Sequence, residues 1–268
     1  MHIMKKDKRI IKKHMRISIF LVQTFLLIGT VFSLNAEGEQ ALPPKQTWSF
    51  DGIFGTYDRA SAQRGYQVYK QVCSACHSMH LLSFRNLGNL GFSKAEVKAI
   101  ARGYDVPGGI SDSGEAVTRQ GEPHDRFVKP FANDEAARSA NNGALPPDLS
   151  LITKARPHGP DYVHALLLGY VDAPAGFHLV DGMHYNKYFP GHQIAMTPPL
   201  KEDIVSYSDG TKATVEQMAT DVVTFLAWAA EPEMEARKRM GVRFFIFLSV
   251  FFIFMFTLYK RTWSGIKK

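Results

Sequence analysis

Cysteine is scarce in this chain, which has two cysteines among 268 residues. They form one pair, Cys73 and Cys76, and no second pair follows. A structural zinc site needs four ligands, so this pair alone cannot complete one. Strand signals are few and no internal repeat is present, so the βαβ context of a thioredoxin-like dithiol is missing too. A redox dithiol or a metal-binding module remains an alternative that the surrounding sequence does not favour.

A basic globular region is also absent, although the formal net charge is +7. Residues 1–36 carry seven Lys/Arg and one Asp, and residues 231–268 carry eight Lys/Arg and three Glu. Residues 37–230 have 17 Lys/Arg against 21 Asp/Glu. This distribution predicts no nucleic-acid partner and a central domain that attracts a cationic protein. The candidate acidic docking residues are Asp112, Glu115, Glu122, Asp125, Glu202 and Asp203.

The cysteine pair belongs to the sequence Cys73-Ser74-Ala75-Cys76-His77. Cys-x-x-Cys-His is the attachment signature of c-type haem. Thiols three residues apart on a helix share a face, where each can form a thioether with a haem vinyl group, and the next imidazole can bind the iron. The motif predicts one covalently attached haem c with His77 as an axial ligand.

The first 36 residues have the pattern of an export signal. Seven basic residues between Lys5 and Arg16 precede an apolar run at residues 17–34, and Ala36 ends the segment. We therefore predict a signal peptide at residues 1–36, with an uncleaved anchor as the alternative. Haem c attachment in bacteria takes place on the exported side, which agrees with this prediction.

Residues 244–259 (FFIFLSVFFIFMFTLY) form an uncharged apolar run. Residues 241–243 lengthen it to about 19, close to the ~20 that span a bilayer. Basic residues flank both ends, so export of the preceding domain, rather than the positive-inside rule, sets the orientation. We expect a juxtamembrane segment and transmembrane helix at 231–260 and a cytoplasmic tail at 261–268, with a buried core helix as the alternative. The expected location is the bacterial inner (cytoplasmic) membrane, single-pass, with the haem domain in the periplasm.

Residues 37–230 are expected to form the exported haem domain. Helical periodicity and capping signals predict helices at residues 58–76, 93–102, 133–140, 161–168 and 214–230. Segments rich in Gly, Pro and Asn predict loops at 106–121, 141–147 and 173–199. The predicted fold class is mainly α: a cytochrome c-like haem domain with long loops plus one C-terminal transmembrane helix.

A second iron ligand is harder to choose from the residues alone. Met196 lies in Ile-Ala-Met-Thr-Pro-Pro-Leu, where prolines stiffen the loop that would hold a weak thioether ligand. His80 is too near the attachment site to reach the opposite face of the iron. The other rivals are Met183, His124, His158, His164, His178, His184 and His192. Spacing does not decide among them.

Several blocks, in order, resemble cytochrome c1, the haem subunit family of the ubiquinol:cytochrome c oxidoreductase (cytochrome bc1 complex). The blocks are CSACHSMHLLSFRNL at 73–87, NNGALPPDLS at 141–150, YNKYFP at 185–190, IAMTPPL at 194–200 and AAEPEMEARKRMG at 229–241. The resemblance runs from about Trp48 to the C-terminal tail.

The resemblance implies roles for individual residues. Cys73 and Cys76 would hold the haem, with His77 and Met196 as the two metal ligands. Arg156, six residues before Tyr162, would pair with a haem propionate, because a buried carboxylate needs such a partner. The other implied haem contacts are Asn141, Ala144, Leu145, Pro146, Pro147, Tyr162 and Arg85. Phe84 stands where the family often has tyrosine, and Pro157, His158 and Pro160 depart from the family pattern before Tyr162.

Together these features predict an electron-transport subunit of a respiratory chain. The resemblance implies that it accepts electrons from the Rieske iron-sulfur protein and passes them to a soluble or tethered cytochrome c, with quinol chemistry on cytochrome b. With both axial positions filled, the iron has no open site, and no residue is expected to act as acid, base or nucleophile. The alternatives are a free membrane-tethered c-type carrier, a c-haem subunit of a terminal oxidase, or a peroxidase or ligand sensor with an open distal site.

Overall fold

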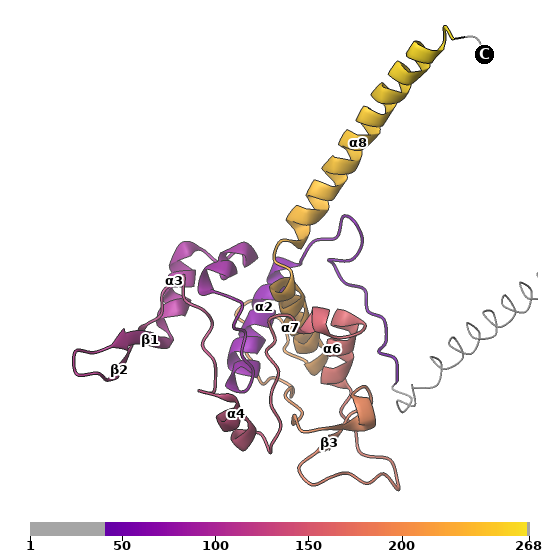
Figure 1. The fold of residues 1–268 in the computed structure, drawn as a ribbon. Coiled ribbons are helices and arrows are strands. Elements are labelled where there is room, and N and C mark those ends of the chain that lie inside the picture. Colours follow the sequence, from indigo (N-terminus) through magenta and orange to yellow (C-terminus); the bar gives the residue numbers. More distant parts are fainter. Residues whose placement is uncertain (1–40, 267–268) are drawn as a thin grey trace, which may run out of the picture. The chain divides into compact units, whose positions relative to one another are not determined.

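The computed structural model describes residues 41–266, which are mainly helical, as the sequence predicts (Figure 1). The predicted signal peptide at 1–36 lies outside the described residues. The elements, in chain order, are α2 (Arg59–Gln71), η1 (Cys73–Ala75), η2 (Phe84–Leu90), α3 (Lys94–Arg102), β1 (Asp105–Ile110), β2 (Ala116–Gln120), α4 (Asp134–Ala140), α5 (Ile152–Ala155), α6 (Gly159–Leu168), β3 (His184–Tyr185), η3 (Pro190–His192), β4 (Gln193–Ile194), α7 (Val215–Ala230) and α8 (Met234–Trp263).

Helix α7 is the central element of the domain, and α2 and α6 pack against it. Its N-cap Thr214 accepts a hydrogen bond from Gln217 N, and residues 221–230 are all buried. Helix α2 approaches α7 closely at Gly65 of α2, where an added Cβ would collide with the backbone carbonyl of Asp221 of α7. The two helices therefore touch backbone to backbone, which a larger residue at position 65 would prevent.

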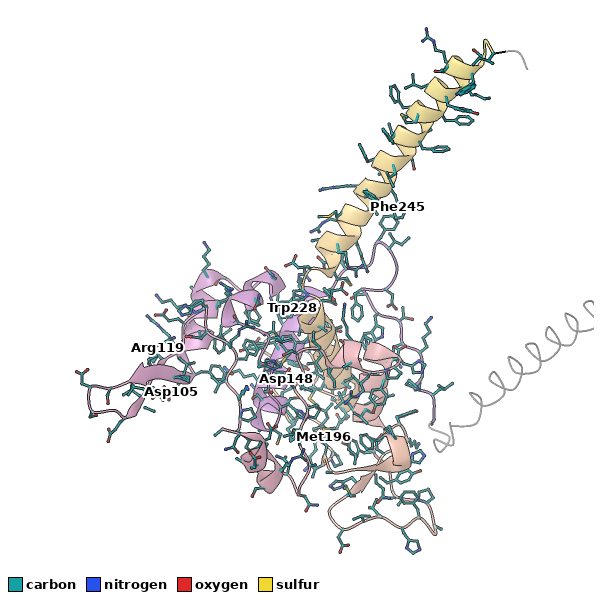
Figure 2. All side chains as sticks on the ribbon, viewed as in Figure 1. Asp105, Arg119, Asp148, Met196, Trp228 and Phe245 are labelled. Carbon is teal, nitrogen blue, oxygen red and sulfur yellow. The ribbon has the colours of Figure 1, made fainter. Side chains whose placement is uncertain are left out.

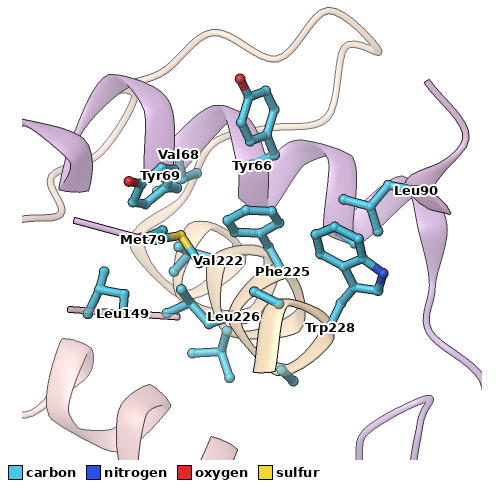
Figure 3. Packing of buried hydrophobic residues seen from close by; sticks show 14 of the residues in the cluster. Tyr66, Val68, Tyr69, Met79, Leu90, Leu149, Val222, Phe225, Leu226 and Trp228 are labelled. Carbon is cyan, nitrogen blue, oxygen red and sulfur yellow. The ribbon is translucent and has the colours of Figure 1, made fainter. Parts of the chain in front are cut away.

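The core between α2 and α7 is aromatic (Figure 3). Tyr66 and Tyr69 from α2 lie with ring centroids 5.6 and 5.8 Å from Phe225, which also stacks on Trp228 at 5.7 Å. Such pairs add to the burial of large apolar area. This cluster fixes the end of α2 from which the cysteine motif follows.

A buried carboxylate also joins the same two helices. Asp221 on α7 is fully buried and accepts from Arg64 Nε at 2.9 Å and Nη2 at 3.0 Å, and from Ser61 Oγ at 2.8 Å. A buried charge is tolerated when it is paired and hydrogen-bonded in this way. Arg64 and Ser61 both belong to α2, so the pair sets the register between the helices.

The five expected helices in the haem domain are present, but two sequence expectations are wrong in detail. The first helix ends at Gln71 rather than Cys76, and the cysteines follow on the 3₁₀ turn η1. The predicted loop at 106–121 is the antiparallel hairpin β1–β2. Its strands are almost wholly exposed, with Val106 the buried residue of β1, so the alternation of apolar and polar residues that indicates a strand is missing. The short elements η2 and α5 were not expected either, and the predicted loop at 173–199 contains the short elements β3, η3 and β4.

Helix α8 begins at Met234, ten residues before the uncharged run, and has 30 residues. Within residues 41–266 it is the one helix long and apolar enough to cross a membrane, with a mean hydropathy of 2.2 and none of that window buried. The charged first turns of α8 contact α2: Glu235 pairs with Arg59 at 2.9 Å. The start of α8 therefore lies beside the start of α2.

Candidate haem site

The Cys-x-x-Cys-His segment continues directly from α2 as a compact turn. The backbone N–H groups of Cys76 and His77 both donate to the carbonyl of Cys73, at 3.1 and 2.9 Å. Both thiols are free and half-buried. Burial, with a smaller effect of Cys76, raises the pKa of Cys73 to about 12. A redox-active dithiol needs the opposite, a lowered pKa that yields thiolate near neutral pH.

The cysteines also lack companions for a zinc ion. Within residues 41–266, no group of three or more His, Cys, Asp or Glu side chains is placed to hold a metal ion. A tetrahedral structural zinc site needs four such ligands. The geometry thus favours two thiols that are available for covalent attachment over a redox dithiol or a zinc module.

His77 is held in one tautomer by a backbone carbonyl. Its Nδ1 lies 2.8 Å from Pro147 O, which can only accept, so Nδ1 carries the proton and donates. Burial lowers the pKa of His77, against smaller opposing effects of Pro147 and Asp148, so the ring is neutral at pH 7. The lone pair on Nε2 is then free to bind a metal. Most metal-binding histidines are oriented in this way, by a hydrogen bond from the ring nitrogen that does not bind the metal.

Asp148 attaches the segment containing Pro147 to the cysteine motif. Its Oδ2 accepts from Ser78 Oγ at 2.7 Å and from His80 N at 2.8 Å, and it pairs with His80 Nδ1 at 2.8 Å. Leu149 N adds a backbone hydrogen bond to Ser78 O at 2.8 Å. Burial acts to raise the pKa of Asp148, but hydrogen bonds from Ser150, His80 and Ser78 outweigh it and hold the pKa well below its usual value.

The structure places the other predicted residues of this block on the loop that leads to Pro147. Asn141 is the C-cap of α4, and its Nδ2 donates to Ala137 O at 2.7 Å. Ala144 N donates to Asn141 O at 2.9 Å. Asn141, Ala144 and Pro146 are half-buried, whereas Pro147 is exposed apart from its carbonyl contact with His77. The prolines and these turns hold the loop in one path toward the imidazole.

Met196 follows β4 on a second segment (Figure 2). The strand pairs with β3 through His184 and Ile194, and Tyr170 Oη donates to the carbonyl of Met196 at 3.0 Å. Burial raises the pKa of Tyr170, so this hydroxyl remains a donor. Met196 itself is half-buried, and the buried Leu200 anchors the far side of its proline pair.

The buried side chain of Asn186 fixes the same segment to α6. Its Nδ2 donates to Leu166 O at 2.8 Å, and its Oδ1 accepts from Tyr188 N at 3.0 Å. Asp148, Tyr170 and Asn186 were missed as site residues. Asp148 lies inside the block 141–150 and Asn186 inside the block 185–190. The sequence blocks that carry the family resemblance therefore include these two residues.

Arg156 is the C-cap of α5, and Tyr162 lies near the start of α6. Burial raises the pKa of Tyr162, and the positive charge of Arg156 partly offsets the effect. Arg156 is exposed, its Nη1 donates to Ala155 O at 3.3 Å, and no carboxylate within residues 41–266 pairs with it. The guanidinium therefore remains available for an acidic group of a ligand.

Within residues 41–266, no hydrogen bond or ion pair joins Arg85 to the other predicted site residues, and none joins Met196 or Arg156 to His77. Arg85 is exposed on η2, and its backbone N–H donates to Pro123 O at 2.6 Å. Its neighbour Phe84 is buried against Phe127 and Tyr104, at 5.0 and 5.1 Å between ring centroids. No contact in the described part of the chain links the Arg85 side chain to the His77 or Met196 segments.

Two of the rival histidines have structural roles. His164 is buried on α6, with Nε2 3.2 Å from Thr220 Oγ1 and an edge-on contact with Trp48. His124 lies on the surface, within 3.4 Å of Glu122 and 3.7 Å of Asp125. Met196 as the second ligand stays a prediction. The donor set of two thiols, one oriented imidazole, one thioether and one unpaired guanidinium fits a covalently attached haem.

Comparison with known proteins agrees with this geometry. The family model of the Cytochrome C1 family matches residues 48–266. "Cytochrome c1 1, heme protein, mitochondrial" of Arabidopsis thaliana is 51% identical over 248 residues, covering 92% of this chain and 80% of that protein. "Cytochrome c1" of Rhodospirillum rubrum is 46% identical over 258 residues, covering 90% of this chain and 94% of that protein. The mitochondrial cytochrome c1 of Saccharomyces cerevisiae is 47% identical, covering 88% and 78%.

Proposed function

Because this chain belongs to the cytochrome c1 family, we propose that it is the haem-bearing electron-transfer subunit of a cytochrome bc1 complex. The observation that carries the proposal is the hydrogen bond from His77 Nδ1 to Pro147 O, next to the paired thiols. It prepares one nitrogen of one imidazole for an iron that the adjacent cysteines would hold covalently.

Each site residue has a role in this proposal. Cys73 and Cys76 would form the two thioethers, and His77 and Met196 would be the two iron ligands. Arg156 would pair with a propionate, and the loop from Asn141 to Pro147, with Ala144 and Pro146, would pack beside the ring. Tyr162 and Arg85 would be further polar contacts. The haem supplies a reversible one-electron couple, and methionine ligation keeps its potential high.

The subunit accepts an electron from the Rieske iron-sulfur protein and passes it to a cationic cytochrome c, while cytochrome b carries the quinol chemistry.

The length of α2 supports a site away from the bilayer. Arg59 at its start pairs with Glu235 of α8, and Cys73 lies two residues beyond the end of this 13-residue helix. At about 1.5 Å per residue, α2 separates the cysteine motif from the start of α8 by about 20 Å.

The topology that we propose keeps the boundaries inferred from the sequence. Residues 1–36 are the signal peptide and 37–230 the exported haem domain. Residues 231–260 comprise the juxtamembrane segment and the membrane helix, and 261–268 are the cytoplasmic tail. The haem domain then faces the periplasm of a bacterial inner membrane. The 30 residues of α8, with none of its apolar window buried, support the single crossing.

The proposal is tested by purifying the full-length protein from its native membranes in mild detergent. We expect haem to stay with the chain through denaturing electrophoresis, and a b-type cytochrome and a Rieske protein to co-purify. In a strain expressing Cys73→Ser, covalent haem should fall to one thioether or none. Absence of covalent haem in the parent protein would overturn the proposal, and haem without the two partners would indicate a free membrane-tethered carrier.

A further inference from the structure

The segment at residues 48–57 forms a loop that lies against the first turns of α8 (Figure 1). The ammonium group of Lys238 donates to two of its backbone carbonyls, Phe50 O at 2.6 Å and Gly55 O at 3.2 Å. These two residues are the ends of a short connection, so one lysine of α8 closes the base of the loop.

A second residue of α8 holds the return of the loop. Glu235 Oε1 accepts from Tyr57 N at 2.9 Å, and its Oε2 pairs with Arg59 at 2.9 Å. Tyr57 Oη also donates to Ala227 O at 3.1 Å, at the end of α7. The loop is thus fixed to α8 on both sides, and its position relative to that helix is set by hydrogen bonds.

The tip of this loop exposes two large apolar side chains. Ile53 is 67% exposed and Phe54 is 83% exposed. Glycines flank them: Gly52 has φ +70°, and a Cβ at Gly55 would collide with the Asp51 carbonyl. The loop buries Trp48, Phe50 and Tyr57 in the domain but turns its tip outward. Exposure of an adjacent Ile and Phe on a fixed loop indicates a contact that the isolated chain does not supply.

The base of the loop contacts α8 at Lys238, shortly before the apolar run begins. Lys238 and Val242, four residues apart on one face of α8, are half-buried, whereas Arg239, Met240 and Arg243 are exposed. The side of α8 that carries Lys238 is therefore covered up to Val242. The uncharged run begins at Phe244, about 9 Å beyond Lys238 at about 1.5 Å per residue.

We infer that Ile53 and Phe54 insert into the interfacial layer of the bilayer that α8 crosses, giving the haem domain a second membrane contact. The inference rests on the proposed membrane topology. Apolar and aromatic side chains bind at the boundary between headgroups and acyl chains, and Arg239 and Arg243 lie where anionic headgroups would be. Two contacts on a fixed loop and a helix restrict the tilt of the domain, and so the direction in which the haem faces its partners.

The test places a nitroxide spin label at each tip residue of the full-length, haem-loaded protein. Ile53→Cys and Phe54→Cys are labelled separately in nanodiscs of equal parts phosphatidylcholine and phosphatidylglycerol. Collision rates with oxygen, which concentrates in the bilayer, are compared with those of a water-soluble nickel chelate. Ile110→Cys is the matched aqueous control, because Ile110 is 75% exposed on the β1–β2 hairpin. Phe247→Cys, 64% exposed on α8, is the membrane reference.

We expect the ratio of oxygen to nickel collisions at both tip positions to exceed that of Ile110→Cys several-fold and to approach that of Phe247→Cys. A ratio equal to that of Ile110→Cys would overturn the inference. Low collision rates with both reagents in the intact bc1 complex would also overturn it, in favour of a protein neighbour. If Phe247→Cys itself is aqueous, the proposed membrane crossing has failed instead. An unchanged haem spectrum confirms that each variant is folded.

Discussion

At the scale of single residues, the site depends on atoms that orient ligands rather than react. Pro147 contributes a carbonyl that fixes the His77 tautomer, and Tyr170 contributes a hydroxyl that fixes the backbone of Met196. Neither role requires a particular side chain at the position that accepts the hydrogen bond. The two proposed ligands, His77 and Met196, are therefore the positions where we expect substitution to change the haem spectrum.

Met196→Leu should remove the iron ligand that we propose at this position while keeping the side-chain volume, a swap that usually costs less than about 1.5 kcal/mol. We expect the redox potential to fall and the reduced protein to bind carbon monoxide, which the parent protein should hardly do. Redox titration and carbon monoxide difference spectra measure both. The matched control is Met183→Leu, in the neighbouring half-buried segment. If Met183→Leu has the effect and Met196→Leu does not, the ligand assignment is wrong.

Asp148→Asn should destabilise the haem domain by about 1–2 kcal/mol at pH 7, because hydrogen bonds to a charged group are lost. The fold lowers the pKa of Asp148 below its unfolded value of about 3.9. Its stabilising effect is therefore complete above that value and disappears as the pH falls through the folded pKa. Guanidinium unfolding followed by haem absorbance should show a smaller difference between parent and variant at acidic pH. Asp172→Asn is the control, at an exposed position that has no hydrogen bond or ion pair within residues 41–266, and it should unfold at nearly the same guanidinium concentration as the parent protein.

At the scale of elements, the position of the cysteine motif depends on the contact between α2 and α7. Gly65→Ala would force a Cβ into the Asp221 carbonyl, so we expect a loss of about 3 kcal/mol in unfolding free energy, despite the better helix propensity of alanine. Gly88→Ala is the control, because nothing lies within 4 Å of its Cβ position. It should remain within about 0.5 kcal/mol of the parent. Equal stability of the two variants would contradict the close approach.

The sequence predicts elements whose signals are local. The capping box of α3 is present, with Glu96 N bonded to Ser93 Oγ at 3.2 Å and Ser93 N to Glu96 Oε2 at 2.7 Å. The β1–β2 hairpin could not be predicted in this way, because its strands have no buried face and therefore no alternation. The end of α2 was also placed too late, since a 3₁₀ turn carries the cysteines.

The same distinction between local and long-range sequence signals applies to the candidate site. A five-residue motif identifies Cys73, Cys76 and His77, since its chemistry is contained in adjacent positions. Pairing of Pro147 with His77, 70 residues apart, depends on the Asp148 contacts and has no local signal. Met196 had equal rivals by spacing alone, and it was the resemblance to a family that singled it out.

At the scale of the whole molecule, charge is separated between the haem domain and the segments at its ends. Residues 37–230 have 21 acidic against 17 basic residues. Some of the candidate docking acids form hydrogen bonds within the protein. Asp125 accepts two hydrogen bonds from Arg119, each of 2.7 Å, and Glu202 accepts one from Val215 N at 3.2 Å. Asp112 and Glu115, near the tip of the β1–β2 hairpin, are exposed and make no ion pair within residues 41–266.

Electron transfer from the reduced protein to a cationic cytochrome c should therefore slow as salt is added. Steering raises association rates by about tenfold or more at low ionic strength, and screening shortens its range from about 30 Å at about 0.01 M to about 3 Å at about 1 M. Stopped-flow kinetics across this range measure the slope. The double variant Asp112→Asn/Glu115→Gln should flatten the slope, whereas Lys154→Gln, at an exposed lysine paired with Glu231 at 2.7 Å, should not flatten it. A rate that is independent of salt in the parent protein would rule out electrostatic docking, and an unchanged slope in the double variant would place the docking surface away from the hairpin.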